Sequence, residues 1–428
     1  MNNVSIKEFL TFLDSSPSPY HTVDSAKSML LADGYTELFE GDEWKMVDGG
    51  KYFVTKNLTS LIAFRYNKDS EGFIAVASHS DFPAYKVKPQ GSEISGKYTR
   101  IPTERYGGMI NYTWFDRPLS VAGRAVINEG DRLSIKLVNV ERDLLVIPSV
   151  AIHMNRTVNE KFSPSPTSDT IPLMASAEGK SLSDVLADTL QVPSESVIAH
   201  DLFLYVRGEG RVFGSSDEFI VAPRIDNLAS VYSSLKAFVS SKGESSIPVL
   251  AIFDNEEVGS DTKQGAASEF FRDTLERVFG GRKELRRAIA KSFMVSADNA
   301  HAIHPNHPEL SDGSNAPEMN KGVVIKYNAN QKYTTDAVSS AVFKSVANAI
   351  GEPLQSYCNR ADMPGGSTLG SIANTSVPVS TVDVGIPQLG MHSAVEVAGS
   401  ADVLSLTKIL TRLYSSSLSF DKGCISVK

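Results

Sequence analysis

The sequence contains two cysteines in 428 residues, Cys358 and Cys424. Neither has a second cysteine at the spacing of a metal-binding motif, so we expect no disulfide framework and no cysteine-type zinc site. This cysteine usage is typical of a reducing compartment. Positive charge is also scarce, because 42 Lys and Arg face 50 Asp and Glu, for a formal net charge of -8. That balance argues against nucleic acid and anionic membrane surfaces as partners.

Long apolar runs are missing as well. No segment approaches the ~20 apolar residues of a membrane-spanning helix. The first residues, MNNVSIKEFLTFLDSSPSPYHTV, lack the basic segment and long apolar run of a secretory signal. They instead predict a short amphipathic helix that ends at Ser-Pro-Ser-Pro. We therefore expect a cytoplasmic protein with no membrane partner.

The chain is long enough for a large core and two domains, and 41% of its residues are hydrophobic. Buried strands are expected at six apolar runs: 61–66, 72–80, 247–254, 293–298, 322–328 and 377–384. The first two runs are expected to pair as a hairpin. Helical patterns cover 226–241, 267–280, 335–351 and 400–417. This alternation predicts an α/β fold, a three-layer sandwich with helices on both faces of a mixed sheet.

Residues 88–218 have a different composition. They contain short β-rich pieces (SVAGRAVI, RLSIKLV, DLFLYV), many turn signals and one helical pattern near SLSDVLADTL. The change predicts a smaller, mostly β domain at 88–218, inserted into an α/β domain that is formed by 1–87 and 219–428.

Acidic residues directly follow a buried strand in the stretch AIFDNEEVGS, residues 251–260. Neighbouring carboxylates repel each other and resist burial, so solvent, a basic partner or a metal ion must offset the cost. Other predicted strands also end on polar residues, and in an open α/β sheet these ends converge on one rim. The residues concerned, with one histidine from a late loop, are His79, Asp81, Asp226, Glu256, Glu257, Asp298 and His392. Two imidazoles and several carboxylates make a ligand set suited to zinc, manganese or cobalt.

Each of these residues, taken alone, has an ordinary alternative. His79 is more often a satisfied core or surface histidine, Asp226 a helix N-cap, and Glu256-Glu257 a solvated turn. The neighbour Asp81 favours a ligand role for His79, because a carboxylate accepts the other ring N–H and selects the tautomer. In the order H-x-D, D-N, E-E, D, H, the residues together predict a site for two metal ions bridged by a carboxylate.

The order of these motifs resembles the M18 family of metalloaminopeptidases, whose best-known members are aspartyl aminopeptidases. The resemblance covers nearly the whole chain, through ASHSDFPAYKVKP, IPSVAIHMNR, FIVAPRIDNLAS, DNEEVGS, SADNAHAIHPNHPE, NRADMPGGSTLG and PQLGMHSAVE. It implies the dinuclear zinc-peptidase fold and two divalent ions per subunit. The ions are expected to be zinc, although the ligand atoms also accept cobalt and manganese.

The resemblance also implies a role for each residue of the set. The ligands would be His79, Asp226 and Asp298 for one ion, and Asp226, Glu257 and His392 for the other. Asp81 would orient His79. Glu256 would act as the general base, taking a proton from water and then donating it. The expected reaction is release of the N-terminal amino acid from a peptide.

Other histidines have different expected roles. His301, His304 and His307 are expected to shape the pocket, because the resemblance gives the metal role in their motif to Asp298. In this family the inserted domain mediates dimerisation, and dimers assemble into a tetrahedral dodecamer. The motif IPSVAIHMNR implies that His153 crosses the dimer interface into the partner's active site. The alternative is a histidine buried in the dimer contact without a catalytic part.

Substrate recognition is expected to need an acid for the free ammonium group, either Asp254 or Asp362. The motif IKYNANQKYTTD offers Lys326 and Lys332, and in the aspartyl members a lysine of this motif pairs with the substrate carboxylate. Lys326 is the candidate, and it implies a preference for acidic N-terminal residues. The alternative is a solvated lysine at a strand end. Some family members prefer neutral or basic residues, and Gly365 stands where cysteine is common.

Two rival functions remain at this point. One is an N-acyl amino acid deacylase on the same dinuclear scaffold, against which the motifs IPSVAIHMNR and DNEEVGS favour the aminopeptidase. The other is a non-catalytic assembly protein, which would have lost ligands or the base. The sequence retains all of them.

Overall fold

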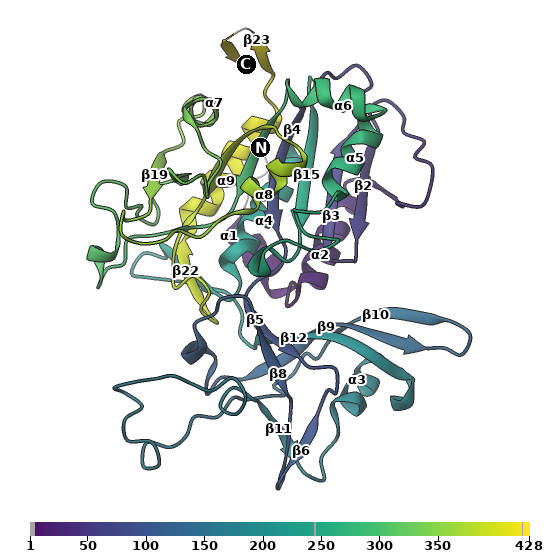
Figure 1. Ribbon diagram of the computed structural model, residues 1–428, viewed down its shortest axis with the longest axis vertical. Coiled ribbons are helices and arrows are strands. Elements are labelled where there is room, and N and C mark those ends of the chain that lie inside the picture. Colours follow the sequence, from purple (N-terminus) through teal and green to yellow (C-terminus); the bar gives the residue numbers. More distant parts are fainter. Residues whose placement is uncertain (1–4, 244, 422) are drawn as a thin grey trace.

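The computed structural model describes residues 5–243, 245–421 and 423–428, and in it the chain forms two bodies (Figure 1). The larger is an α/β body. The smaller, residues 84–206, is here called the β body and lies below the α/β body in this view. Residues 1–4, the start of the expected N-terminal helix, lie outside the described residues, and α1 (Ile6–Asp14) follows them.

The α/β body contains a mixed sheet of nine strands among the described residues, in the order β1-β2-β3-β15-β4-β16-β20-β18-β19. In that order the strands are Thr36–Leu38, Lys51–Lys56, Ser60–Arg65, Ile247–Phe253, Phe73–His79, Phe293–Ala297, Ser380–Gly385, Val323–Tyr327 and Leu354–Cys358. The central strands β15, β4, β16 and β20 run parallel. Every residue of β4 and β15 is buried, because both faces of these strands are covered. Their carboxyl ends therefore meet at one rim of the sheet.

The expected hairpin of residues 61–66 and 72–80 is wrong. Strand β15 lies between β3 and β4, antiparallel to β3 and parallel to β4. The two runs are neighbours in sequence, but each is apolar on both faces. Such strands bury more surface when a third apolar strand separates them than when they pair at an edge.

Helices cover both faces of the sheet, as predicted for a three-layer sandwich (Figure 1). One face carries α1, α2 (Pro19–Ala32), α4 (Ile225–Ser240), α7 (Ala337–Asn348) and α9 (Ser400–Tyr414). The other carries α5 (Phe270–Phe279), α6 (Arg282–Ile289) and α8 (Leu369–Ser376). Successive side chains of β4 point to opposite faces of the sheet. Ile74 and Val76 pack into the core on the first face, and Phe73 and Ala75 pack into the core on the second.

The β body is built on an antiparallel sheet in the order β10-β9-β12-β5-β8. These strands are Leu133–Asn139, Leu119–Asn128, Val197–Val206, Ala84–Val87 and Thr103–Tyr106. A second small sheet has β11 (Leu173–Ser176), β7 (Tyr98–Arg100) and β6 (Glu93–Ser95), and α3 (Leu182–Leu190) packs nearby. The division at residues 88 and 218 stays a prediction. Strand β5, which ends just before residue 88, already pairs with β12.

A further sheet lies beside the rim, in the order β13-β14-β22-β21-β17. Its strands are Arg211–Phe213, Phe219–Ala222, Glu396–Gly399, Pro387–Leu389 and Ala300–His301. The chain ends in a hairpin of β23 (Leu418–Asp421) and β24 (Cys424–Val427). Short 3-10 turns are η1 (Asn111–Trp114), η2 (Ser194–Ser196), η3 (Glu256–Val258) and η4 (Pro308–Leu310). Within the described residues, no helix has the length and apolar character needed to span a bilayer.

Candidate metal centre

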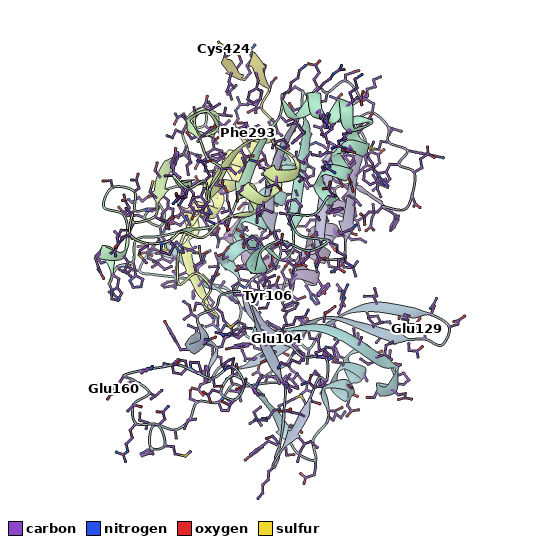
Figure 2. All side chains as sticks on the ribbon, viewed as in Figure 1. Glu104, Tyr106, Glu129, Glu160, Phe293 and Cys424 are labelled. Carbon is purple, nitrogen blue, oxygen red and sulfur yellow. The ribbon has the colours of Figure 1, made fainter. Side chains whose placement is uncertain are left out.

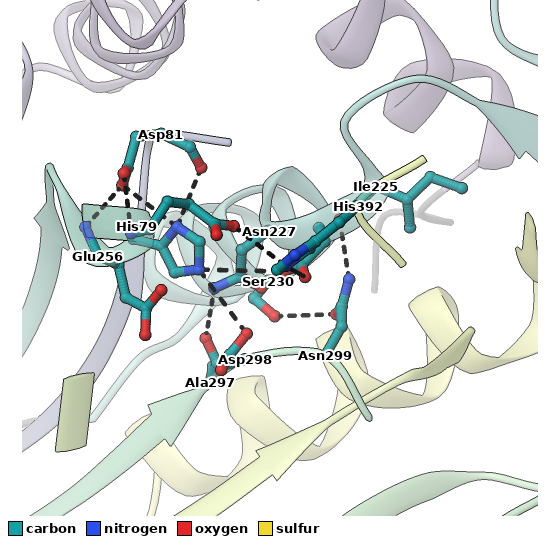
Figure 3. Close-up of polar contacts among 12 residues, drawn as sticks. His79, Asp81, Ile225, Asn227, Ser230, Glu256, Ala297, Asp298, Asn299 and His392 are labelled. Atoms are coloured by element: carbon teal, nitrogen blue, oxygen red, sulfur yellow. Dashed lines mark hydrogen bonds and ion pairs between the residues drawn. The ribbon is translucent and has the colours of Figure 1, made fainter. Parts of the chain in front are cut away.

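The predicted ligands meet at the carboxyl-end rim of the central strands. His79 is the last residue of β4, and the parallel register sets it opposite Phe253 at the end of β15. The turn with Glu256 therefore begins beside the histidine. Asp298 follows β16 directly, and His392 comes from the connection between β21 and β22. Figure 3 shows His79, Asp298 and His392 converging from these separate elements.

Asp226 precedes the regular part of α4. Its backbone angles, φ -83° and ψ 111°, are not helical, and the residue at the helix N-cap is Arg224. The Asp226 Oδ1 has no hydrogen-bond partner among the described residues and its Oδ2 faces His392, so the side chain does not cap the helix and the N-cap interpretation is wrong. The Asp226-Asn227 peptide bond is cis, and the Asp226 side chain is 3% exposed.

The carboxylate of Asp226 lies between the two histidines. Its Oδ1 is 3.9 Å from His79 Nε2, which is also 3.7 Å from Asp298 Oδ1. Its Oδ2 is 3.4 Å from His392 Nε2, which is also 3.4 Å from Glu257 Oε1. Within each of the two groups, one ligand atom per residue lies within 4.8 Å of the others. Two metal-sized sites thus share one carboxylate.

The side chains fit divalent ions at both sites. Asp226 Oδ1 is buried and has no hydrogen-bond partner among the described residues. A buried anionic oxygen without a donor is costly, and a cation between it and His79 Nε2 removes that cost. The donor atoms, imidazole nitrogen and carboxylate oxygen, are those that zinc accepts. A further grouping of His79, Glu256 and Glu257 also lies within ligand distance.

Both histidines have their second ring nitrogen engaged. His79 Nδ1 lies 3.0 Å from the main-chain oxygen of Asp81 and 3.3 Å from its Oδ1. His392 Nδ1 donates to the backbone oxygen of Gly108 at 2.6 Å. These acceptors hold the proton on Nδ1 and leave each Nε2 free to bind a metal, which is the usual arrangement around a ligating histidine.

Asp81 binds the metal-site turn as well as His79. Its Oδ1 accepts from the backbone N–H of Glu256 and its Oδ2 from that of Glu257, each at 3.1 Å. Oδ2 also accepts from the hydroxyl of Tyr106 at 2.6 Å. Asp81 is fully buried. One carboxylate therefore ties a metal-facing histidine to the turn that carries the two glutamates.

The acids compete for protons in this pocket. Burial raises the pKa of Glu256 to about 8, although the charge of His79 opposes the shift. Burial also raises the pKa of Glu257 well above its usual value. Burial disfavours the charged form of His392, but its hydrogen bond to Asp226 and the charge of Glu257 raise its pKa to about 10. Protons thus occupy positions that cations otherwise take.

Lys326 is part of the site and is not a solvated residue at a strand end, so that interpretation is wrong. It is 2% exposed, and its Nζ lies 3.2 Å from Asp298 Oδ2 and donates to the backbone oxygen of Asn299 at 3.1 Å. Its ammonium lies 5.1 Å from the centre of the Tyr333 ring. Although burial opposes ionisation of Asp298, the charge of Lys326 lowers the pKa of that acid.

A cavity of about 190 Å³ opens onto the ligands and is also lined by Lys326, His301, Tyr333 and Met391. Gly365 lines a second cavity, of about 670 Å³. A Cβ added at Gly365 would lie 2.6 Å from Asn359 Oδ1. A side chain at position 365 would therefore displace Asn359 and change the shape of this second cavity.

The other predicted substrate residues lie apart from this cavity. Asp254 is 4% exposed, accepts from Gln264 and is absent from the described lining. Asp362 is exposed and pairs with Arg360 at 2.6 Å. His153 is exposed in the β body, outside the described lining of the site. Within one chain, these three residues are not brought to the ligands.

Of the three histidines in DNAHAIHPNHPE, only His301 is among the described residues that line the cavity. The ring of His304 lies 5.3 Å from that of His307, and His307 pairs with Glu309 at 3.1 Å. The metal-sized groups found among the described residues do not include these histidines.

Two residues that support the site, Glu396 and Tyr106, were not predicted from the sequence. Glu396 is 2% exposed and accepts from the backbone N–H groups of Asp226, at 2.9 Å, and His392, at 2.8 Å. Tyr106 reaches Asp81 from the β body. Glu396 had a detectable signal, an acid four residues after His392 in an otherwise apolar stretch. Tyr106 had none, because its partner is distant in sequence.

Comparison with known proteins agrees with the fold and the ligand chemistry. The chain matches the family described as "Aminopeptidase I zinc metalloprotease (M18)" over residues 12–414. It is 42% identical to a protein of Clostridium acetobutylicum described as a probable M18 family aminopeptidase 2, over 96% of this chain and 98% of the relative. This chain belongs to the M18 family of aminopeptidases.

Other relatives of this M18 metalloaminopeptidase cover it almost fully. A probable M18 family aminopeptidase 2 of Pseudomonas entomophila is 37% identical over 95% of this chain and 97% of the relative. Among solved structures, Ape4 in the Ape4 and Nbr1 complex matches with a TM-score of 0.91 and 34% identity, over 96% of this chain and 85% of that chain. The dodecamer of mApe1 from S. cerevisiae matches with a TM-score of 0.85 and 26% identity, over 95% of each chain.

Proposed function

We propose that this M18 aminopeptidase is a dinuclear enzyme in which Glu256 is the general base and acidic N-terminal residues are preferred. The observation that carries the proposal is the position of Asp226, whose two carboxylate oxygens face two different histidines. His79, Asp226 and Asp298 would hold one ion. Asp226, Glu257 and His392 would hold the other. Zinc is the proposed metal, and cobalt and manganese suit the same atoms.

When bound, two divalent ions lower the pKa of water and polarise the scissile carbonyl. The protein's own part is proton transfer and positioning. Glu256 lies in the turn after β15, and its pKa is raised to about 8 in the absence of metal. Its carboxylate takes a proton from water and passes it to the leaving amine. Asp81 holds His79 and this turn in fixed relative positions, because its carboxylate contacts His79 Nδ1 and the backbone N–H of Glu256.

Lys326 supports the preference for acidic residues, because its buried ammonium lines the cavity beside the ligands. A substrate carboxylate would share this cation with Asp298. Neither Asp254 nor Asp362 lines this cavity, so the proposal assigns the substrate ammonium to neither of them. The alternatives are the same activity with a neutral or basic preference, and an N-acyl amino acid deacylase on the same scaffold.

Assembly is the second part of the proposal. The chain would form homodimers through the inserted domain, and these would form a tetrahedral dodecamer in the cytoplasm, with His153 entering the partner's active site. Two observations support it. The mApe1 relative is described as a dodecamer, and the residues beside His153, Ile152 and Met154, are 47% and 77% exposed apolar side chains.

Glu256→Gln tests the mechanism. The variant keeps the shape of the side chain and removes the base, so kcat/KM should fall by ~10²–10⁴-fold while both ions stay bound. Glu43→Gln, an exposed glutamate, is the matched control. Metal content and hydrolysis of aminoacyl p-nitroanilides and N-acetyl amino acids would be measured together. Full activity in Glu256→Gln, or turnover of the N-acetyl compounds alone, would contradict the proposal.

Lys326→Met tests the preference. Loss of a charge-assisted hydrogen bond should lower kcat/KM for Asp and Glu substrates by ~10–100-fold more than for Leu substrates. Lys332→Met is the control, since Lys332 is exposed on the following loop. An equal loss for acidic and neutral substrates would leave the neutral or basic alternative as the better account.

A further inference from the structure

A segment of the β body reaches both halves of the metal centre. Residues 106–113, here called the strap, run from the last residue of β8 into η1. Figure 2 labels Tyr106 at the junction of the two bodies. We propose that the strap sets the geometry of both halves of the metal centre, with Tyr106 as a positioning residue for one half and Gly108 and Thr113 for the other. This inference rests on the dinuclear site proposed above.

Tyr106 holds the half of the site that contains His79. Its hydroxyl donates to Asp81 Oδ2 at 2.6 Å, and Asp81 Oδ1 is the oxygen that faces His79 Nδ1 at 3.3 Å. A hydrogen bond to a buried carboxylate is strong and short. Together with the backbone N–H groups of Glu256 and Glu257, Tyr106 therefore holds the rotation of Asp81, and through it the ring orientation of His79.

The same hydroxyl also holds the turn of the two glutamates. It accepts from Asn255 Nδ2 at 2.8 Å. The side-chain oxygen of Asn255 in turn accepts from Thr262 Oγ1 and Gln264 Nε2, each at 2.8 Å. Asn255 has φ +63° and is the residue directly before Glu256. One phenol thus joins the two supports of the turn, Asp81 and Asn255.

The rest of the strap holds the half that contains His392. The backbone oxygen of Gly108 accepts from His392 Nδ1 at 2.6 Å, and the N–H of Ile110 donates to the backbone oxygen of His392 at 3.0 Å. Thr113 Oγ1 accepts from the N–H of Ala394 at 2.9 Å. Three hydrogen bonds therefore fasten the loop of this ligand to the strap.

Gly107 allows the strap to lie close to the ligands. It has φ +74°, and a Cβ added there would lie 3.1 Å from Cβ of Glu257. A side chain at 107 would be strained in this backbone conformation and would press on a proposed ligand. The strap thus contacts Asp81, Glu257 and His392, which come from three separate elements.

Tyr106→Phe separates the positioning role from packing. The Tyr106 ring packs edge-on against Phe203, with the ring centres 5.3 Å apart, and the variant keeps this contact. It removes only the hydroxyl shared by Asp81 and Asn255. Loss of such an outer partner typically costs 10–100-fold in metal affinity or activity. Tyr98→Phe is the control, because Tyr98 is in the same body and 55% exposed.

The test measures zinc affinity by competition with a chelator on the full chain, without any substrate. Tyr106→Phe should bind the zinc of the half that contains His79 about tenfold or more weakly than wild type, and Tyr98→Phe should match wild type. Thr113→Val should weaken the other zinc, and Thr113→Ser, which keeps the hydroxyl, should restore it. This second pair decides the question if Tyr106→Phe fails to fold.

Affinities within twofold of wild type in both Tyr106→Phe and Thr113→Val would overturn the strap proposal. Failure of the proposed function looks different. Wild type itself would then bind fewer than two zinc ions, or Glu256→Gln would remain fully active.

Discussion

The two histidines of the metal centre lie in different surroundings. The His79 side chain is 1% exposed, at the end of a central strand, and its Nδ1 lies 3.0 Å from the backbone oxygen of Asp81 and 3.3 Å from its carboxylate. The His392 side chain is 31% exposed, in a loop, and its Nδ1 donates to the backbone oxygen of Gly108 in the β body. A carboxylate beside the ring N–H, in addition to a carbonyl, makes the imidazole a stronger ligand than a carbonyl alone does, and burial slows exchange of the ion. We therefore expect the His79 half to hold its ion more tightly than the His392 half.

Asp226→Asn should have the largest effect on metal content and activity, because it alters the one carboxylate that belongs to both halves of the metal centre. The amide offers one oxygen where the carboxylate offers two, and Asp226 belongs to both ligand groups. We expect the loss of at least one ion per chain and a fall in kcat/KM on the order of 10⁴-fold. Metal analysis and peptide hydrolysis measure this, with Asp42→Asn, an exposed site, as control. Two retained ions would show that Asp226 is not shared.

His79→Ala and His392→Ala should differ from each other. His79→Ala leaves the buried Asp81 without its imidazole and opens a cavity, so the free energy of unfolding should fall by ~2–4 kcal/mol. His392→Ala removes a partly exposed ring and should cost less than ~1 kcal/mol in the metal-free protein. His392→Ala should also retain one ion per chain. Urea unfolding and metal analysis test both points, and equal losses in the two variants would refute the comparison.

The smallest effect is a pH dependence of the metal-free protein. The folded-state pKa values of Glu256, Glu396 and His392, about 8, 8 and 10, lie above their ordinary values. The folded state therefore binds more protons than the unfolded state, and its stability is lost as pH rises through these values. The pKa of Asp298 is lowered, so the stability that this group contributes is lost only as the pH falls into the acid range.

We thus expect the free energy of unfolding of the metal-free protein to fall between pH 6 and 9. The stabilisation by added zinc should grow over the same range, since zinc binds the deprotonated side chains. Urea unfolding at several pH values, with and without zinc, measures both trends. A rise in the stability of the metal-free protein over this range would contradict the comparison.

The gathering of the proposed ligands at one rim was predictable from sequence, but the residues that support them were only partly so. Apolar runs that stop at His79 or Asp298 carry the signal of a strand end, and metal ligands are restricted to a few residue types. The rotation of His392 depends on the backbone oxygen of Gly108, which any residue type offers, so sequence alone cannot indicate it.

The fold shows the same limit. Strands were predicted from their apolar pattern, but the insertion of β15 between β3 and β4 depends on long-range pairing. Helix α2 was missed because Ser-Pro-Ser-Pro was interpreted as the end of one helix. It also begins the next, with Ser18 as N-cap and Pro19 in the first turn.

The most direct test of the central claim is anomalous diffraction at the zinc edge from crystals of the zinc-loaded protein. The account predicts two peaks per chain, one among His79, Asp226 and Asp298 and one among Asp226, Glu257 and His392. The second peak should fade first as a chelator is added. A single peak, or two peaks that do not share Asp226, would contradict it.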